Sequence, residues 1–161
     1  MSIKIVERFI KGKKDNEELC EDGLVITDNY ISVIDGVTSK GKILWDNKTS
    51  GVYVKNLLVE AITKMSPNFD AKNCIEYLNS LINDEYKKRN MYEIAKEHPE
   101  ERLQANLVIF NIKKNEIWLW GDCQTLVNNK LFHIEKKTDK ILAEVRSLFI
   151  DLELKNGKSM E

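Results

Sequence analysis

Three acidic residues and one glycine have the clearest chemical potential in this chain: Glu21, Asp22, Asp35 and Gly36. They flank two short β-rich runs, 24–26 and 30–34, which are separated by Asp28-Asn29. Both turn residues tolerate positive φ, so this pair suits a tight hairpin turn. Such a hairpin places Asp22 directly opposite Asp35, with Cβ atoms about 5 Å apart, where like charges destabilise a sheet.

A hard divalent cation would relieve that repulsion, because Mg²⁺ and Mn²⁺ prefer carboxylate oxygens, backbone carbonyls and water. Glu21 adds a third carboxylate beside the pair. Gly36 allows a sharp exit from the strand and can present its carbonyl to an ion. The alternative is that the strands end before Asp22 meets Asp35, which leaves both carboxylates solvated.

The elements around this hairpin predict an α+β fold with mostly antiparallel sheets. Apolar residues recur at helical spacing over 50–65, after Thr49 or Ser50 as a cap, and in a second helix that Asp70 can cap. Residues 86–101 are charged and less regular. The other predicted elements are a strand at 3–10, a strand buried on both faces at 105–112, a strand at 117–120, a hairpin of 126–127 and 131–134 around Asn128-Asn129, and a last helix capped by Thr138. We expect a single domain over 1–161, with 153–161 as a frayed tail.

Composition narrows the class of protein. The 161 residues are 42% hydrophobic and 32% charged with a net charge of −1, so nothing points to nucleic acid. No apolar run has the length of a signal peptide core or a membrane span. The three cysteines are odd in number and widely spaced, which favours a reducing compartment, and we expect the cytoplasm. Two histidines argue against a histidine-rich metal site.

The segment C-E-D-G-L-V-I-T-D-N-Y-I-S-V-I-D-G, Cys20 to Gly36, resembles the opening of the PPM (type 2C) family of metal-dependent Ser/Thr protein phosphatases. In that family an E-D pair starts one strand, and a hydrophobic strand ends in D-G before a glycine-containing loop and a long helix. A later strand ends in G-D-S, which resembles Gly121-Asp122-Cys123 here. The resemblance covers about 17–134 and implies a layered α/β/β/α sandwich, of which this chain would be an incomplete part.

The resemblance also implies a site and an activity. Asp35 and the Gly36 carbonyl would bind metal, and Glu21 and Asp22 would orient metal-bound waters or bind directly. Asp22 and Asp35 would be the catalytic residues. Two Mg²⁺ or Mn²⁺ ions would activate a water that attacks the phosphorus of a phosphoprotein substrate. Gly121-Asp122 would be structural.

The chain departs from the family pattern in several places. The family arginine that holds the substrate phosphate is missing before the E-D pair, where Arg8, Lys13 or Lys14 are the possible substitutes. The family supplies further metal-binding aspartates downstream, whereas this chain has only Asp139 and Asp151 after Asp122. Three explanations stay open: a fragment, a fold completed by a second chain, or a reduced and inactive relative. We expect an apolar face to remain exposed and to cause self-association or poor solubility.

Two other functions are alternatives to the phosphatase. The first is a catalytically inactive PPM-like module that binds a regulatory protein partner. The second is a hydrolase of the N-terminal nucleophile type, which would use Ser2 after removal of Met1. No lysine or oxyanion pattern supports the second.

Overall fold

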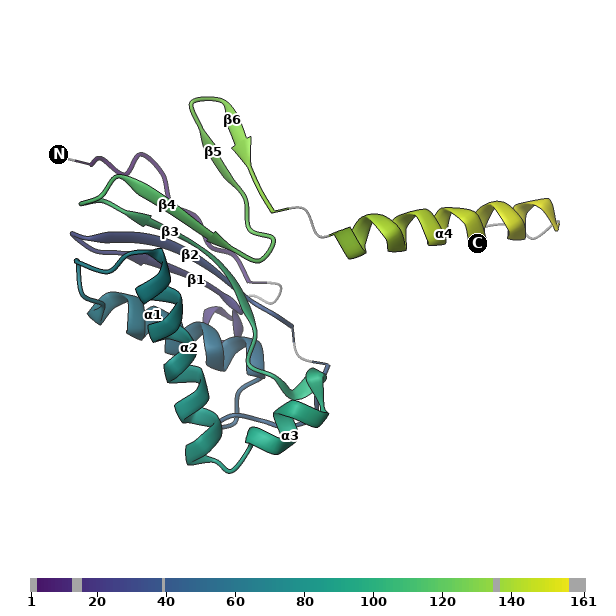
Figure 1. Cartoon of the computed structure of the whole chain (residues 1–161), viewed down its shortest axis with the longest axis horizontal. Helices are drawn as coiled ribbons and strands as arrows, with labels where there is room; N and C mark the ends of the chain where they lie inside the picture. Colours follow the sequence, from purple (N-terminus) through teal and green to yellow (C-terminus); the bar gives the residue numbers. More distant parts are fainter. Residues whose placement is uncertain (1–2, 13–15, 39, 135–136, 157–161) are drawn as a thin grey trace.

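The computed structural model describes residues 3–12, 16–38, 40–134 and 137–156. Four strands form an antiparallel sheet in chain order: β1 (Asp22–Ile26), β2 (Tyr30–Gly36), β3 (Ala105–Asn111) and β4 (Glu116–Trp120). A separate two-stranded hairpin consists of β5 (Thr125–Val127) and β6 (Lys130–Phe132). The helices are α1 (Ser50–Lys64), α2 (Ala71–Lys88), α3 (Tyr92–Glu97) and α4 (Lys137–Lys155), with short 3₁₀ turns η1 (Glu17–Leu19) and η2 (Pro99–Glu101). The predicted α+β class with antiparallel sheets is confirmed (Figure 1).

The hairpin of β1 and β2 has the predicted register, with Asp22 opposite Asp35. Its turn differs from the prediction, because neither Asp28 nor Asn29 adopts positive φ. Instead the Thr27 hydroxyl accepts hydrogen bonds from the backbone N–H groups of Asn29, at 3.3 Å, and Tyr30, at 2.9 Å. A side-chain acceptor at the start of the loop therefore closes a turn that needs no left-handed residue.

The hairpin of β5 and β6 does use the left-handed conformation. Asn128 and Asn129 have φ of 49° and 63°, as a two-residue hairpin turn of this kind requires.

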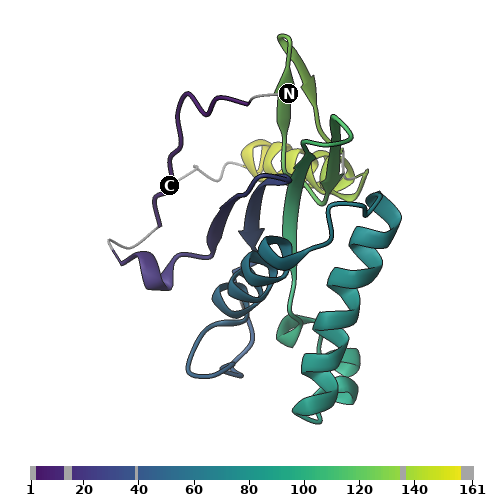
Figure 2. The same cartoon turned by 90° about the vertical axis from the view of Figure 1, so that its left-hand side faces the viewer.

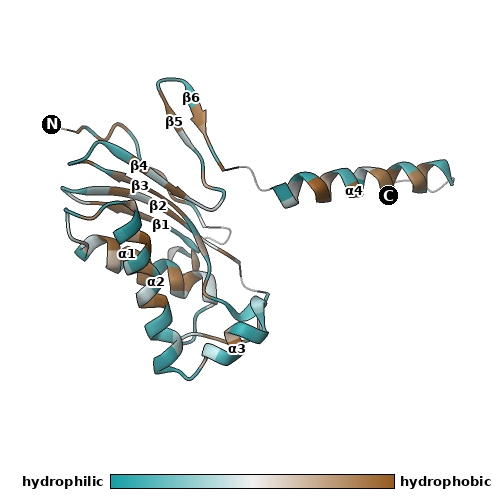
Figure 3. Cartoon of the chain, viewed as in Figure 1, coloured by the Kyte–Doolittle hydropathy of each residue, from teal (hydrophilic) through white to brown (hydrophobic). Residues whose placement is uncertain are grey.

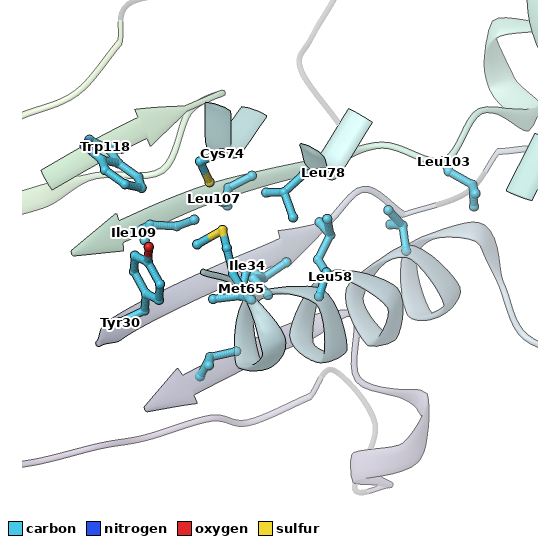
Figure 4. Close-up of a cluster of buried hydrophobic side chains, with 14 of the residues drawn as sticks. Tyr30, Ile34, Leu58, Met65, Cys74, Leu78, Leu103, Leu107, Ile109 and Trp118 are labelled. Carbon is cyan, nitrogen blue, oxygen red and sulfur yellow. The ribbon is translucent and has the colours of Figure 1, made fainter. Parts of the chain in front are cut away.

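Helices α1 and α2 cover one face of the four-stranded sheet and build the core there (Figures 2 and 4). Alternate residues of the strands, such as Ile34 and Ile109, meet the apolar faces of the two helices, including Leu58 and Leu78. Both predicted caps are present: the Thr49 side chain accepts from Val52 N, and Asp70 Oδ1 accepts from Asn73 N at 2.7 Å. Packing therefore fixes the sheet against two well-capped helices.

The opposite face of the sheet is also apolar, yet no described helix packs on it. We call it the open face, and it carries Leu24, Ile26, Ile31, Val33, Val108, Phe110, Ile117 and Leu119. These residues are half-buried or exposed, with 51% of Val33 accessible to solvent. The prediction that 105–112 is buried on both faces is therefore wrong for Val108 and Phe110, because only the other face has a helix layer.

Several predicted boundaries differ at the two ends of the chain. The segment 3–10 forms no strand; Val6 and Phe9 remain 89% and 79% exposed, because no neighbouring strand pairs with it. Helix α4 begins at Lys137, so Thr138 lies inside the helix and does not cap it. The helix continues to Lys155, past the predicted start of the frayed tail, while 157–161 lie outside the described residues.

Helix α4 extends away from the sheet beyond the β5–β6 hairpin (Figure 1). Within the described ranges, no helix combines the length and apolar character needed to cross a membrane.

Candidate functional site

A row of polar residues crosses the open face at one end of the sheet. Asp22 pairs with Asp35 across β1 and β2, and Asp35 pairs with Asn106 across β2 and β3. The Asn106 side-chain amide donates a hydrogen bond to Asp35 Oδ2 at 3.3 Å. Since directly opposed residues project from the same face of a sheet, the two carboxylates and the amide lie side by side.

Asn106 was not predicted as a site residue. Its position at the entry of a buried strand gave a weak signal, but only the β2–β3 pairing places it beside Asp35.

No cationic side chain among the described residues neutralises the Asp22–Asp35 pair. Within the described residues, neither carboxylate forms an ion pair with lysine, arginine or histidine. Besides the amide on Asp35, the only side-chain polar contact that the pair makes in the described part of the chain is from the Cys20 thiol to Asp22 Oδ2 at 3.9 Å. The pair therefore keeps the electrostatic repulsion that its sequence predicts.

The Glu21 carboxylate has different hydrogen-bond partners from the Asp22 carboxylate. Its two carboxylate oxygens accept hydrogen bonds from the Thr38 hydroxyl at 2.8 Å and the Thr49 hydroxyl at 3.2 Å. Its backbone carbonyl accepts from Gly36 N at 3.0 Å, which extends the β1–β2 ladder by one pair. Glu21 thus ties the start of β1 to the loop after β2 and to the N-terminus of α1.

Gly36 is required for close packing between β2 and α1. A Cβ atom at Gly36 would clash with the Gly51 carbonyl oxygen and would lie 2.8 Å from the Glu21 carbonyl oxygen. A Cβ atom at Gly51 would lie 2.6 Å from a Glu21 carboxylate oxygen. The first turn of α1 can approach the acidic end of the sheet because both positions lack a side chain.

All four predicted site residues line one cleft of about 280 Å³, together with Thr38 and Thr49 among others. Asp22 also borders a larger cleft of about 540 Å³ on the β1 side, which Arg8 and Lys55 line. Asp35 borders a third, open cleft with Lys40, Asn106 and Asp122. Each of the opposed carboxylates therefore borders two clefts, and they share the one of about 280 Å³.

The structure does not gather a complete metal-binding set. Within the described part of the chain, no three His, Cys, Asp or Glu side chains are arranged to hold an ion. Asp139 and Asp151 both belong to α4, which extends away from the four-stranded sheet (Figure 1). Gly121 has φ of 83° and lies against Asn106, which agrees with a structural turn at Gly121-Asp122. No protein-family model, curated protein or solved structure matches this chain.

Proposed function

We propose that this chain is a metal-dependent phosphatase-like domain of the PPM type, which acts on phosphomonoesters of phosphoproteins. One observation carries the proposal: Asp22 and Asp35 face each other across a hairpin, without a compensating cation in the described residues, at the edge of a cleft. Such an arrangement costs free energy unless a ligand of opposite charge binds there.

The donor set suits Mg²⁺ or Mn²⁺, since carboxylates, a side-chain amide and a backbone carbonyl are all hard oxygen donors. Asp22 and Asp35 would hold the ion, and Asn106 orients the Asp35 carboxylate through its 3.3 Å hydrogen bond. Glu21, fixed by two threonine hydroxyls, and Gly36 form the adjoining wall of the cleft. When bound, a divalent cation would activate water and stabilise negative charge on phosphoryl oxygens.

The fold supports the same proposal. A helix layer on one face of an antiparallel sheet, with an apolar second face, matches one half of an α/β/β/α sandwich. In a complete sandwich of this type a second sheet covers that face; the described residues of this chain leave it open, with the acidic row at its edge.

A phosphate group also needs positive charge, and the cleft beside Asp22 contains two cationic side chains. Arg8 and Lys55 line this cleft, and neither forms an ion pair with another described residue. The stem of Lys55 passes over Gly23, where a Cβ atom would lie 3.0 Å from Lys55 Cγ. We propose that these residues replace the missing family arginine; Lys13 and Lys14 lie outside the described residues.

A second candidate function is a PPM-like module that binds a regulatory protein without catalysis. The hydrogen bonds from Thr38 and Thr49 favour it, because they use the Glu21 carboxylate for structure. The third alternative, an N-terminal nucleophile hydrolase, depends on Ser2, which lies outside the described residues.

Metal binding can be tested by thermal unfolding with and without millimolar Mn²⁺ or Mg²⁺. We expect Mn²⁺ to stabilise the wild-type chain by about 2.7 kcal/mol at a concentration of 100 times the Kd. Asp35→Asn should remove this gain and should stabilise the metal-free protein by about 0.2–1 kcal/mol, because the repulsion disappears. Asp28→Asn, in the exposed turn of the same hairpin, is the matched control and should behave like wild type. Equal metal stabilisation of the wild type and Asp35→Asn would refute the site.

Hydrolysis of p-nitrophenyl phosphate separates the two PPM-like functions. Mn²⁺-dependent turnover that Asp35→Asn abolishes would support the enzyme. Metal-dependent stabilisation without turnover would leave the binding module.

A further inference from the structure

Helix α4 presents a continuous apolar stripe to solvent. The stripe consists of Ile141, Leu142, Val145, Leu148, Phe149 and Leu152, whose exposed fractions lie between 41% and 63%. These residues repeat at helical spacing and so share one side of a 19-residue helix that is about 28 Å long. Figure 3 shows the hydrophobic bands along a helix that lies apart from the other described elements. Such a stripe is typical of a helix that packs against an apolar surface.

The open face is an apolar surface of matching shape on the same chain. Four strands give it a width of roughly 19 Å, and strands of this length run for about 17–24 Å. Helices α1 and α2 occupy the other face, so the open face can accept one more helix. The N-terminal segment borders this face at its β1 side: Ile3 and Ile5 line a cleft with Ile26 and Ile31, and Phe9 and Ile10 line a cleft with Leu24.

We propose that α4 of one chain packs on the open face of a second copy, and that the exchange is reciprocal. Each copy carries one stripe and one receiving face, so a twofold dimer satisfies both surfaces and closes without further growth. A helix on a sheet buries roughly 400 Å² from either surface, and two such contacts total about 1,600 Å², the usual size of a stable interface.

Charge favours α4 of the second copy, rather than the sheet of the second copy, as the element that packs on the open face. Packing two open faces with their acidic ends together would bring the Asp22 and Asp35 carboxylates of both copies close, and it would leave the α4 stripe in water. Lys137 lies one turn before Ile141 on the same side of α4, at the end of the helix that carries partial positive charge. An α4 whose N-terminus points to the acidic end of the sheet therefore places a cation near the uncompensated pair.

Disulfide trapping tests the arrangement. All variants carry Cys123→Ser, which removes the one native cysteine that is not buried; Cys20 and Cys74 are buried and can stay. Chains with Val33→Cys and chains with Leu148→Cys are mixed, equilibrated and oxidised in EDTA, which makes the test independent of metal binding. We expect a cross-linked dimer from the mixture and little from either variant alone. Cross-linking of Leu148→Cys alone would mean that α4 packs against α4 of the second copy. Cross-linking of Val33→Cys alone would mean that the two open faces pack against each other. An internal disulfide in the double variant would mean that α4 packs on the open face of its own chain. Each of these three results would overturn the proposal.

Light scattering after size exclusion gives a second measurement that does not depend on oxidation. The wild-type chain should be a dimer at micromolar concentration, and Val33→Glu and Leu148→Glu should each reduce it to a monomer. Ile150→Glu, which lies off the stripe, and Val37→Glu, beyond the end of β2, are the matched controls and should remain dimeric. A monomeric wild-type chain, or a dimer that survives Val33→Glu, would contradict the proposal; circular dichroism verifies that each variant is folded.

Discussion

At the scale of single residues, the acidic end of the sheet depends on two glycines, because their lack of a side chain allows close packing. Gly36 and Gly51 let the first turn of α1 approach the end of β2, and Glu21 fills the remaining space with two hydrogen bonds to threonine. The site residues are therefore coupled to the packing of α1.

We expect Gly36→Ala to destabilise the protein by about 1–3 kcal/mol, because the new methyl group meets backbone atoms that cannot move independently. Gly23→Ala is the matched control in the same sheet. Its methyl group would meet the flexible Lys55 side chain and Val59 at 3.0 Å, so the loss should be smaller. Denaturant unfolding measures both, and equal losses would argue against the backbone clash.

At the scale of elements, the helix layer relies on local capping. Asp70 accepts a hydrogen bond from Asn73 N and orders the start of α2, which supplies Cys74 and Leu78 to the core.

Asp70→Ala should lower the free energy of unfolding by about 1 kcal/mol, since a backbone donor loses its partner. Asn79→Ala, at an exposed position inside α2, should be neutral or slightly stabilising because alanine is the better helix former. Chemical denaturation compares the two variants. A loss at Asn79→Ala as large as that at Asp70→Ala would mean that the cap has no special role.

At the scale of the whole molecule, the core between sheet and helices holds acidic groups in their protonated form. Burial raises the pKa of the Cys74 thiol from 9.0 to about 12. Burial also raises the pKa of Tyr30 and of Tyr86, whose hydroxyl accepts a hydrogen bond from Leu103 N at 2.7 Å. Between about pH 9 and 12 the folded chain keeps the Cys74 proton that the unfolded chain has lost, so stability falls as pH rises.

We therefore expect the unfolding free energy to decrease above pH 9, with Cys74 contributing up to about 1.4 kcal/mol per pH unit. Cys74→Ala should cost some packing energy at pH 7 but should flatten this slope. Cys123→Ala, at a half-buried turn position, is the control and should keep the wild-type slope. Denaturation midpoints from pH 7 to 10.5 measure the effect, and an unchanged slope in Cys74→Ala would exclude the thiol as its source.

The sequence by itself determined the features that depend on nearest neighbours. Alternation in two short runs with a two-residue turn was enough to predict the β1–β2 register and the opposition of Asp22 and Asp35. Helical spacing and local side-chain acceptors likewise predicted α1 and α2 with their caps at Thr49 and Asp70. These features involve residues a few positions apart, where backbone geometry leaves few options.

Only the tertiary structure decided what depends on distant contacts. The Glu21 carboxylate turns to Thr38 and Thr49, 17 and 28 positions away, and so differs from the predicted cluster of three acids. Asn106 reaches Asp35 across 71 positions because β3 pairs with β2. Side-chain periodicity shows that a strand has an apolar face, but which face receives a partner depends on where the remaining elements pack.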